Sequence, residues 1–218
     1  MRDRIIDELG DLPSSRFLVY LMGPYKAFDL ERALETLDPG NVPESVDFGA
    51  LTTASQSTER PRELEREEAA LDLILEVRDH LRTEAGVNAF LAIDVDVPLE
   101  ELDAAAQSIA FARASNAVIY VVPAMGDNLG VGIEVGSVLE ALYTGEDPDG
   151  HRERVMFVHE SGVRSAMIGA VRDRWDVRIY AYDDRAELAR QCRLFVRDLI
   201  RRERVGELSE LKSGGSIE

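Results

Sequence analysis

The sequence predicts a single α/β domain, built on a doubly wound, flavodoxin-like sheet of five parallel strands with helices on both faces. Short apolar runs alternate along the chain with longer segments of helical periodicity. These runs are apolar at nearly every position rather than at every second one, which is typical of strands buried on both faces. A chain of 218 residues also has the length of one domain and buries about 70% of its unfolded surface without a disulfide or metal.

Five segments have the composition of buried strands, and turn or polar residues bound each of them. The first of these runs stops at Gly23-Pro24, a dipeptide that a strand does not continue through. The predicted strands are residues 16–22, 88–95, 117–122, 155–158 and 177–181.

Helical spacing of apolar residues, with Pro or Gly near several of the ends, predicts the connecting helices. These helices are residues 29–37, 61–85, 98–112, 130–143, 164–172 and 185–204. We expect the domain to span residues 1–204, with 41–59 as a flexible loop or lid, because that segment is rich in Ser, Thr, Gly, Asn and Pro. Residues 205–218 are expected to form a mobile tail.

The charge balance excludes several classes of partner. With 25 basic and 42 acidic residues the chain carries a net charge of −17, which repels nucleic-acid polymers and anionic membrane surfaces. Only Lys26 and Lys212 are lysines, and acidity with Arg in place of Lys is typical of halophilic archaea. No apolar run reaches the ~20 residues that span a bilayer, and the amino terminus is charged, so we expect a cytoplasmic protein.

The sequence gives no sign of a metal or cofactor, and we expect neither. One cysteine and three histidines argue against a disulfide scaffold or a zinc site, and Cys192 lies within the last predicted helix as a packed thiol. There is no P-loop motif. The glycines at 130, 132 and 136 do not match the spacing of a dinucleotide-binding fingerprint.

In a doubly wound sheet, ligands bind beyond the carboxyl ends of the strands. The segment after the third strand is the most informative there, because Gly130 and Gly132 leave the backbone at a helix start open to a ligand. Glu134 is expected in the first turn or so, where the helix dipole favours an ionised carboxylate at the edge of the crevice. The alternative is an ordinary acidic residue that stabilises a helix start.

Two motifs carry a family resemblance. The segment Gly130-Val131-Gly132-Ile133-Glu134-Val135-Gly136 follows a strand, and Val19-Tyr20-Leu21-Met22-Gly23-Pro24 ends one. Together they resemble the nucleoside 2-deoxyribosyltransferase superfamily, which includes the deoxynucleoside 5′-monophosphate N-hydrolases, in a divergent haloarchaeal-type form.

The resemblance implies cleavage of an N-glycosidic bond, as a hydrolase or a deoxyribosyltransferase. By that likeness, Glu134 is the nucleophile that attacks the anomeric carbon, and Tyr20 orients its carboxylate. The implied partner is a small nucleoside or nucleotide, and members of the family assemble as homodimers or larger oligomers.

The implied substrate contacts come from two loops. Asn128, or Asp127 if the loop register shifts, matches a residue that contacts the 5′ end of the sugar. Lys26 is placed to meet an anion. The remaining implied binding residues are Gly23, Pro24, Gly130, Gly132 and Ser108.

One departure from the family pattern keeps a second function open. Ser108 stands where the family carries an aspartate that handles the leaving base, and neither Ser108 nor Gln107 is a general acid near neutral pH. Asp103 substitutes only if the helix register differs. The alternative is therefore a non-catalytic regulatory domain of the same fold that binds a nucleoside or nucleotide.

Overall fold

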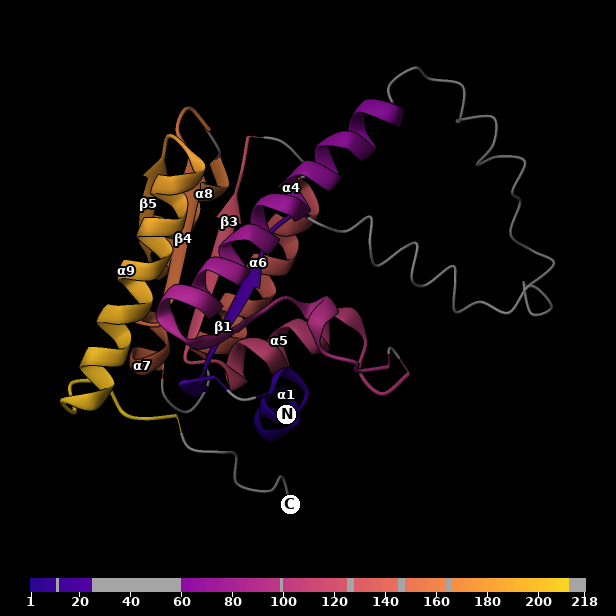
Figure 1. The fold of residues 1–218 in the computed structure, drawn as a ribbon. Coiled ribbons are helices and arrows are strands. Elements are labelled where there is room, and N and C mark those ends of the chain that lie inside the picture. Colours follow the sequence, from indigo (N-terminus) through magenta and orange to yellow (C-terminus); the bar gives the residue numbers. More distant parts are fainter. Residues whose placement is uncertain are drawn as a thin grey trace, which may run out of the picture.

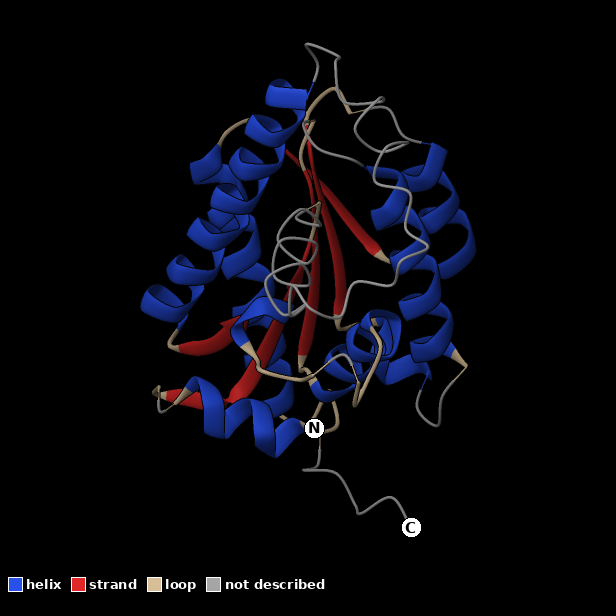
Figure 2. Cartoon of the chain, turned by 90° about the vertical axis from the view of Figure 1, so that its right-hand side faces the viewer, coloured by secondary structure: helices blue, strands red, loops and turns tan. Residues whose placement is uncertain are grey.

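The computed structural model describes residues 1–10, 12–24, 60–98, 100–124, 128–144, 148–163 and 166–211. At its centre five parallel strands form an open sheet in the order β2-β1-β3-β4-β5. Helices lie on both sides of this sheet (Figures 1 and 2). The predicted fold class, a doubly wound, flavodoxin-like α/β sheet, is therefore confirmed.

The strands are the apolar runs that the sequence singled out. Every residue of the central strand β3 is buried, as expected for a strand that is covered on both faces. The strands are β1 (Ser14–Met22), β2 (Val87–Phe90), β3 (Ala117–Val122), β4 (Val155–Glu160) and β5 (Arg178–Tyr182).

The helices divide between the two faces of the sheet, as Figure 2 shows. Apolar side chains of α4 and α9 pack in one core layer, and those of α1, α5, α6 and α8 pack in the other. The strands serve both layers because successive side chains point to opposite faces. The helices are α1 (Arg2–Leu9), α4 (Arg60–His80), α5 (Ala104–Ala114), α6 (Asn128–Tyr143), α7 (Pro148–Arg152), α8 (Ala166–Trp175) and α9 (Arg185–Arg204).

Two predicted boundaries are wrong for reasons that the local hydrogen bonds show. The strand predicted to reach Val95 ends at Phe90, because the Asp94 carboxylate accepts the Leu91 N–H (2.9 Å) and closes the 3-10 turn Ala92–Asp94. The helix predicted from residue 98 begins only at Ala104.

Asp103 is the residue that starts this helix. Its carboxylate accepts the backbone N–H of Ala106 (2.9 Å), which is the hydrogen bond of an N-cap. Pro98 instead opens a separate turn, in which its carbonyl accepts from Glu101 and Leu102.

Other differences are smaller. The long helix predicted for 61–85 is α4 followed by the π-helical turn Leu81–Ala85. The short helices α1 and α7 were not predicted. The predicted helix 29–37 and the predicted loop 41–59 lie outside the described residues.

A buried polar network joins the chain at the amino ends of β1 and β3. Arg2 is only 7% exposed and donates to the Ala114 carbonyl (2.5 Å) and to Asn116 Oδ1 (2.8 Å). Asn116 Oδ1 also accepts the backbone N–H of Leu18 (3.0 Å). Burial lowers the pKa of Arg2, and the charge of Glu203 opposes that shift. The first helix is therefore fixed to the sheet by a desolvated guanidinium.

The same network extends to the last helix. Asn116 Nδ2 donates to Glu203 Oε1 (2.9 Å), and buried Arg154 donates to the same oxygen (2.5 Å). Arg154 also donates to the carbonyls of Asn116 (3.0 Å) and Ser209 (2.5 Å). Leu208 is 5% exposed, so the start of the segment predicted as a tail, residues 205–211, packs against the domain.

We expect Asn116→Ala to lower the free energy of unfolding by about 2–4 kcal/mol, because it leaves buried donors and acceptors on several elements without partners. Urea denaturation followed by circular dichroism measures this change. Ser161→Ala, at an exposed turn, is the control and should change the value by less than about 0.5 kcal/mol. An equally small effect at Asn116 would contradict the structural role of the network.

Candidate functional site

The candidate site lies where the strand order of the sheet reverses. The chain leaves β1 toward β2 on one side and returns to β3 on the other, so the switch point lies between β1 and β3. Because Met22 pairs with Tyr120, and a Cβ on Gly23 would lie 2.9 Å from the Val121 carbonyl oxygen, the turn at 23–24 leaves the sheet beside the end of β3. The helix α6 comes next in the chain after β3.

Tyr20 lies on the α6 side of the sheet. Its side chain is fully buried, stacked on Phe90 (centroids 5.2 Å apart) and edge-on to Phe111 (5.7 Å). Val135 and Val138 of α6 belong to the same core layer. The fold therefore places the Tyr20 side chain in the core layer to which α6 contributes Val135 and Val138.

Glu134 lies deeper in its helix than the sequence suggested. Because α6 begins at Asn128, two residues before the predicted start at Gly130, Glu134 lies in its second turn. The helix dipole acts mainly on the first turn, so it contributes less to Glu134 than expected. The side chains of residues 128–134 lie outside the described part of the structure, as do Lys26 and Asp127.

Gly23 is required by a close approach of three elements. A Cβ at this position would lie 2.4 Å from Cδ1 of Ile74 in α4 and 2.9 Å from the Val121 carbonyl oxygen of β3. Atoms at these distances overlap, so only glycine lets β1 turn here without moving its neighbours. Pro24, the next residue, is buried.

None of the three residues considered for the role of the base-handling aspartate, Ser108, Gln107 and Asp103, is placed to act as a general acid. Ser108 is 4% exposed within α5. Gln107 donates to the carbonyls of Val97 (2.9 Å) and Leu102 (2.8 Å). Asp103 caps α5, so its carboxylate serves the backbone. These residues hold the start of α5 in place and supply no proton donor.

A second polar cluster lies at the carboxyl ends of β3, β4 and β5. Glu160 Oε2 accepts the backbone N–H of Ala124 (2.8 Å), which ties the end of β4 to the loop after β3. His159 Nδ1 lies 3.0 Å from the Glu160 carbonyl, which only accepts, so Nδ1 carries the proton. By strand alternation His159 faces the α6 side, as Tyr20 does.

Tyr182 lies at the same end of the sheet, paired with Glu160 and on the opposite face from His159, and it was not predicted from the sequence. The residue is 3% exposed, and its hydroxyl has no hydrogen-bond partner among the described residues. Burial raises the pKa of Tyr182, and the negative charge of Glu160 adds to that rise. Its position as the last residue of β5 is the signal that points to it.

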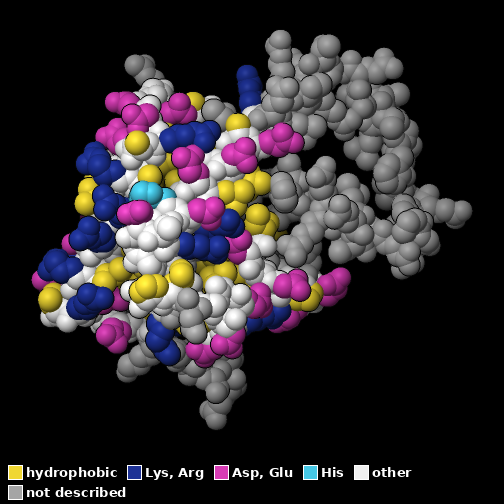
Figure 3. Space-filling view, in the orientation of Figure 1, with side chains coloured by type: hydrophobic (Ala, Val, Ile, Leu, Met, Phe, Trp, Pro, Cys, Tyr) yellow, Lys and Arg dark blue, Asp and Glu magenta, His cyan; other side chains and the backbone are white. Residues whose placement is uncertain are grey.

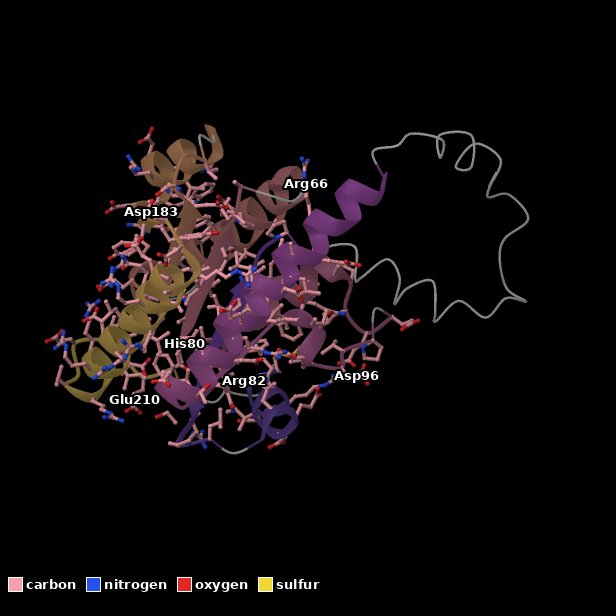
Figure 4. All side chains as sticks on the ribbon, turned by 45° about the horizontal axis from the view of Figure 1, so that its top comes forward. Arg66, His80, Arg82, Asp96, Asp183 and Glu210 are labelled. Carbon is pink, nitrogen blue, oxygen red and sulfur yellow. The ribbon has the colours of Figure 1, made fainter. Side chains whose placement is uncertain are left out.

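The acidic residue after β2 has a structural partner. Asp94 Oδ1 accepts from Arg78 (2.6 Å), and its Oδ2 lies 3.4 Å from Arg82. Figure 4 shows Arg82 and His80 at the end of α4 opposite to Arg66. These contacts tie the loop after β2 to the far end of α4.

The described helices are each too short or too polar to cross a membrane. Within the same residues, no group of three or more His, Cys, Asp and Glu side chains is placed to hold a metal ion.

Comparison with known proteins shows the family of the chain. Residues 2–212 match the family described as "Domain of unknown function (DUF7509)", and the chain belongs to it. No curated protein matches the sequence. Among solved structures, the chain is similar to the IL-17 receptor B SEFIR domain, with 9% identity and a TM-score of 0.38, covering 83% of this chain and 96% of that one.

We expect Gly23→Ala to destabilise the protein by about 1–3 kcal/mol, because the new methyl group overlaps Ile74 and the Val121 carbonyl. Thermal and urea unfolding measure the loss, and Ile74→Val in the same chain should restore part of it by removing the nearest atom. Gly136→Ala is the matched control, since nothing lies within 4 Å of that added methyl. It should be neutral or stabilising, as Ala favours a helix by about 1 kcal/mol over Gly.

Cys192 should be unreactive in the folded protein. It is fully buried, and burial raises the pKa of its thiol to about 12, so almost no thiolate exists at pH 8. A colorimetric disulfide reagent should label it slowly in buffer and at once in denaturant. The folded pKa lies above the unfolded value, so this group favours the folded state less as the pH rises above about 8.5. Rapid labelling of native protein would contradict this burial.

Proposed function

We propose that this chain binds a nucleoside or nucleotide at the carboxyl edge between β1 and β3 and cleaves its N-glycosidic bond, with Glu134 as the nucleophile. The observation that carries the proposal is the position of the glycine-rich start of α6, which follows β3 at the switch point of the sheet. Ligands of doubly wound folds bind at this point, and glycines there leave the backbone accessible.

Two further observations support the proposal. Tyr20 is buried in the core layer to which α6 contributes, and a phenol there is suited to orient a carboxylate of that helix. The turn at Gly23 packs closely against α4 and β3, which fixes the backbone on one side of the proposed site.

The chemistry of the proposed reaction has two steps. The Glu134 carboxylate forms an ester bond to the anomeric carbon as the carbon–nitrogen bond breaks, and the electron pair leaves with the base. Water then hydrolyses the ester, or a second base accepts the sugar, which separates hydrolase from transferase activity. In the first step, Tyr20 orients the Glu134 carboxylate, so that this nucleophile is better positioned for attack.

The environment of α5 favours the second candidate, a regulatory domain that binds a nucleoside or nucleotide without turnover. Ser108 is buried, Gln107 is hydrogen-bonded to two carbonyls, and Asp103 caps the helix, so none of them protonates a leaving base. Binding at the same edge of the sheet needs no such acid.

The test is incubation of the purified protein in high salt with a panel of nucleosides, 2′-deoxynucleosides and their 5′-monophosphates, with free base measured by chromatography. We expect base release, and Glu134→Gln should reduce it by about 10³-fold or more. Glu140→Gln makes the same chemical change on an exposed position of the same helix and should leave the rate unchanged. Thermal stabilisation by a ligand without base release supports the binding domain. If the protein shows neither base release nor stabilisation with any compound of the panel, both functions are contradicted.

Tyr20→Phe tests the positioning role separately. The ring contacts with Phe90 and Phe111 stay, so the fold should be kept while the hydroxyl is lost. We expect kcat to fall by about 10–100-fold with little change in KM, because the residue acts on the nucleophile rather than on the substrate. An unchanged kcat would remove Tyr20 from the site.

A further inference from the structure

A shallow hollow opens between the edge strand β5 and the last helix. It has a volume of about 230 Å³ and is lined by Arg178, Tyr180, Gln191, Leu194, Phe195 and Asp198. Tyr180 is 39% exposed and Leu194 is 46% exposed, so two large apolar side chains meet water at one place. Among the described residues, β5 has a strand neighbour on only one side, so within that part of the chain its outer backbone edge is not paired in the sheet.

The helix α9 is basic, in contrast to the chain as a whole. The helix α9 carries seven arginines against three acidic residues, whereas the whole chain has a net charge of −17. Figure 3 shows these basic side chains along the side of the molecule that α9 forms in Figure 1.

The pattern of charges along α9 is complementary to itself in the antiparallel direction. If Leu194 lies opposite Leu194 of a second copy, residues at equal distances on either side of it face one another. Glu187 then faces Arg201, and Arg190 faces Asp198. Within one chain Glu187 pairs with Arg190 (3.3 Å), and Asp198 pairs with both Arg178 (3.2 Å) and Arg201 (3.4 Å).

The edge strand β5 can pair with its copy about the same twofold axis. Tyr180 is the central residue of β5, and antiparallel pairing about it continues the sheet into a second copy. Tyr180 and Leu194 line the same hollow, so one twofold axis passes near both. The short turn between β5 and α9 sends the helix back along the strand, and an axis perpendicular to the sheet therefore makes both the strands and the helices antiparallel across the contact.

We propose that a second copy of this chain docks on this surface, with β5 against β5 and α9 beside α9. The contact covers the exposed Tyr180 and Leu194, pairs the free strand edge, and matches acidic with basic side chains along the helix. It uses neither the carboxyl edge between β1 and β3 nor any residue of the proposed nucleoside site, and it stands whether or not that site is catalytic.

The first test is the oligomeric state of the full chain by analytical ultracentrifugation over a range of protein concentrations, in low and in high salt. We expect a dimer. Leu194→Asp should raise the dissociation constant of this dimer by more than about tenfold, because it places two carboxylates face to face on the axis. Arg174→Glu, on an equally exposed arginine of α8, is the control and should leave the dimer unchanged. Circular dichroism confirms that each variant is folded.

A charge swap tests the direction of the helices. Arg190→Glu should weaken the dimer, because it places an acid opposite Asp198 of the other copy. Arg190→Glu combined with Asp198→Arg in one chain should restore it to within about threefold of the original, since the facing pair is reversed on both sides of the axis. A monomer at every concentration, a dimer that tolerates Leu194→Asp, or a swap that does not recover would each overturn the proposal.

Discussion

When helices cover both faces of a sheet, its strands have side chains and backbone groups accessible to a ligand only at their ends. In this protein β1 and β3 are buried along almost their whole length, and their backbone groups are used by the neighbouring strands. Residues at the strand ends are the ones left to meet a ligand or another element. The two ends of the sheet differ. Buried charged side chains hold the chain at the amino ends of the strands, whereas turns and the glycine-rich start of α6 follow the carboxyl ends.

At the amino ends, one asparagine holds four elements together. Asn116 accepts from Arg2 of α1 and from β1, and donates to Glu203 of α9, which buried Arg154 also binds. A buried polar group that loses its hydrogen-bond partner destabilises the fold by more than a typical surface contact stabilises it. The network therefore strongly favours this one arrangement of the elements that it joins. The structure gives Asn116 this role because its side chain meets partners from segments that lie far apart in the sequence.

The carboxyl edge and the β5–α9 surface are separate features with separate physical causes. The edge between β1 and β3 follows from the strand order, which places the Gly23 turn beside the end of β3, the strand that precedes α6 in the chain. The β5–α9 surface follows from β5 being the last strand, so that its outer side and the adjoining flank of α9 have no neighbour within the described chain. A nucleoside site and a contact between copies can therefore coexist without competing for residues.

The sequence by itself determined the fold class, the five strands, the last helix and the family resemblance that selects Tyr20 and Glu134, because apolar runs, helical spacing and local motifs are short-range patterns. It could not determine the end of β2, the start of α5 or the role of Asn116, since each depends on hydrogen bonds between residues whose pairing only the folded chain decides. The close approach at Gly23 and the hollow that joins Tyr180 to Leu194 likewise exist only once distant segments have packed together.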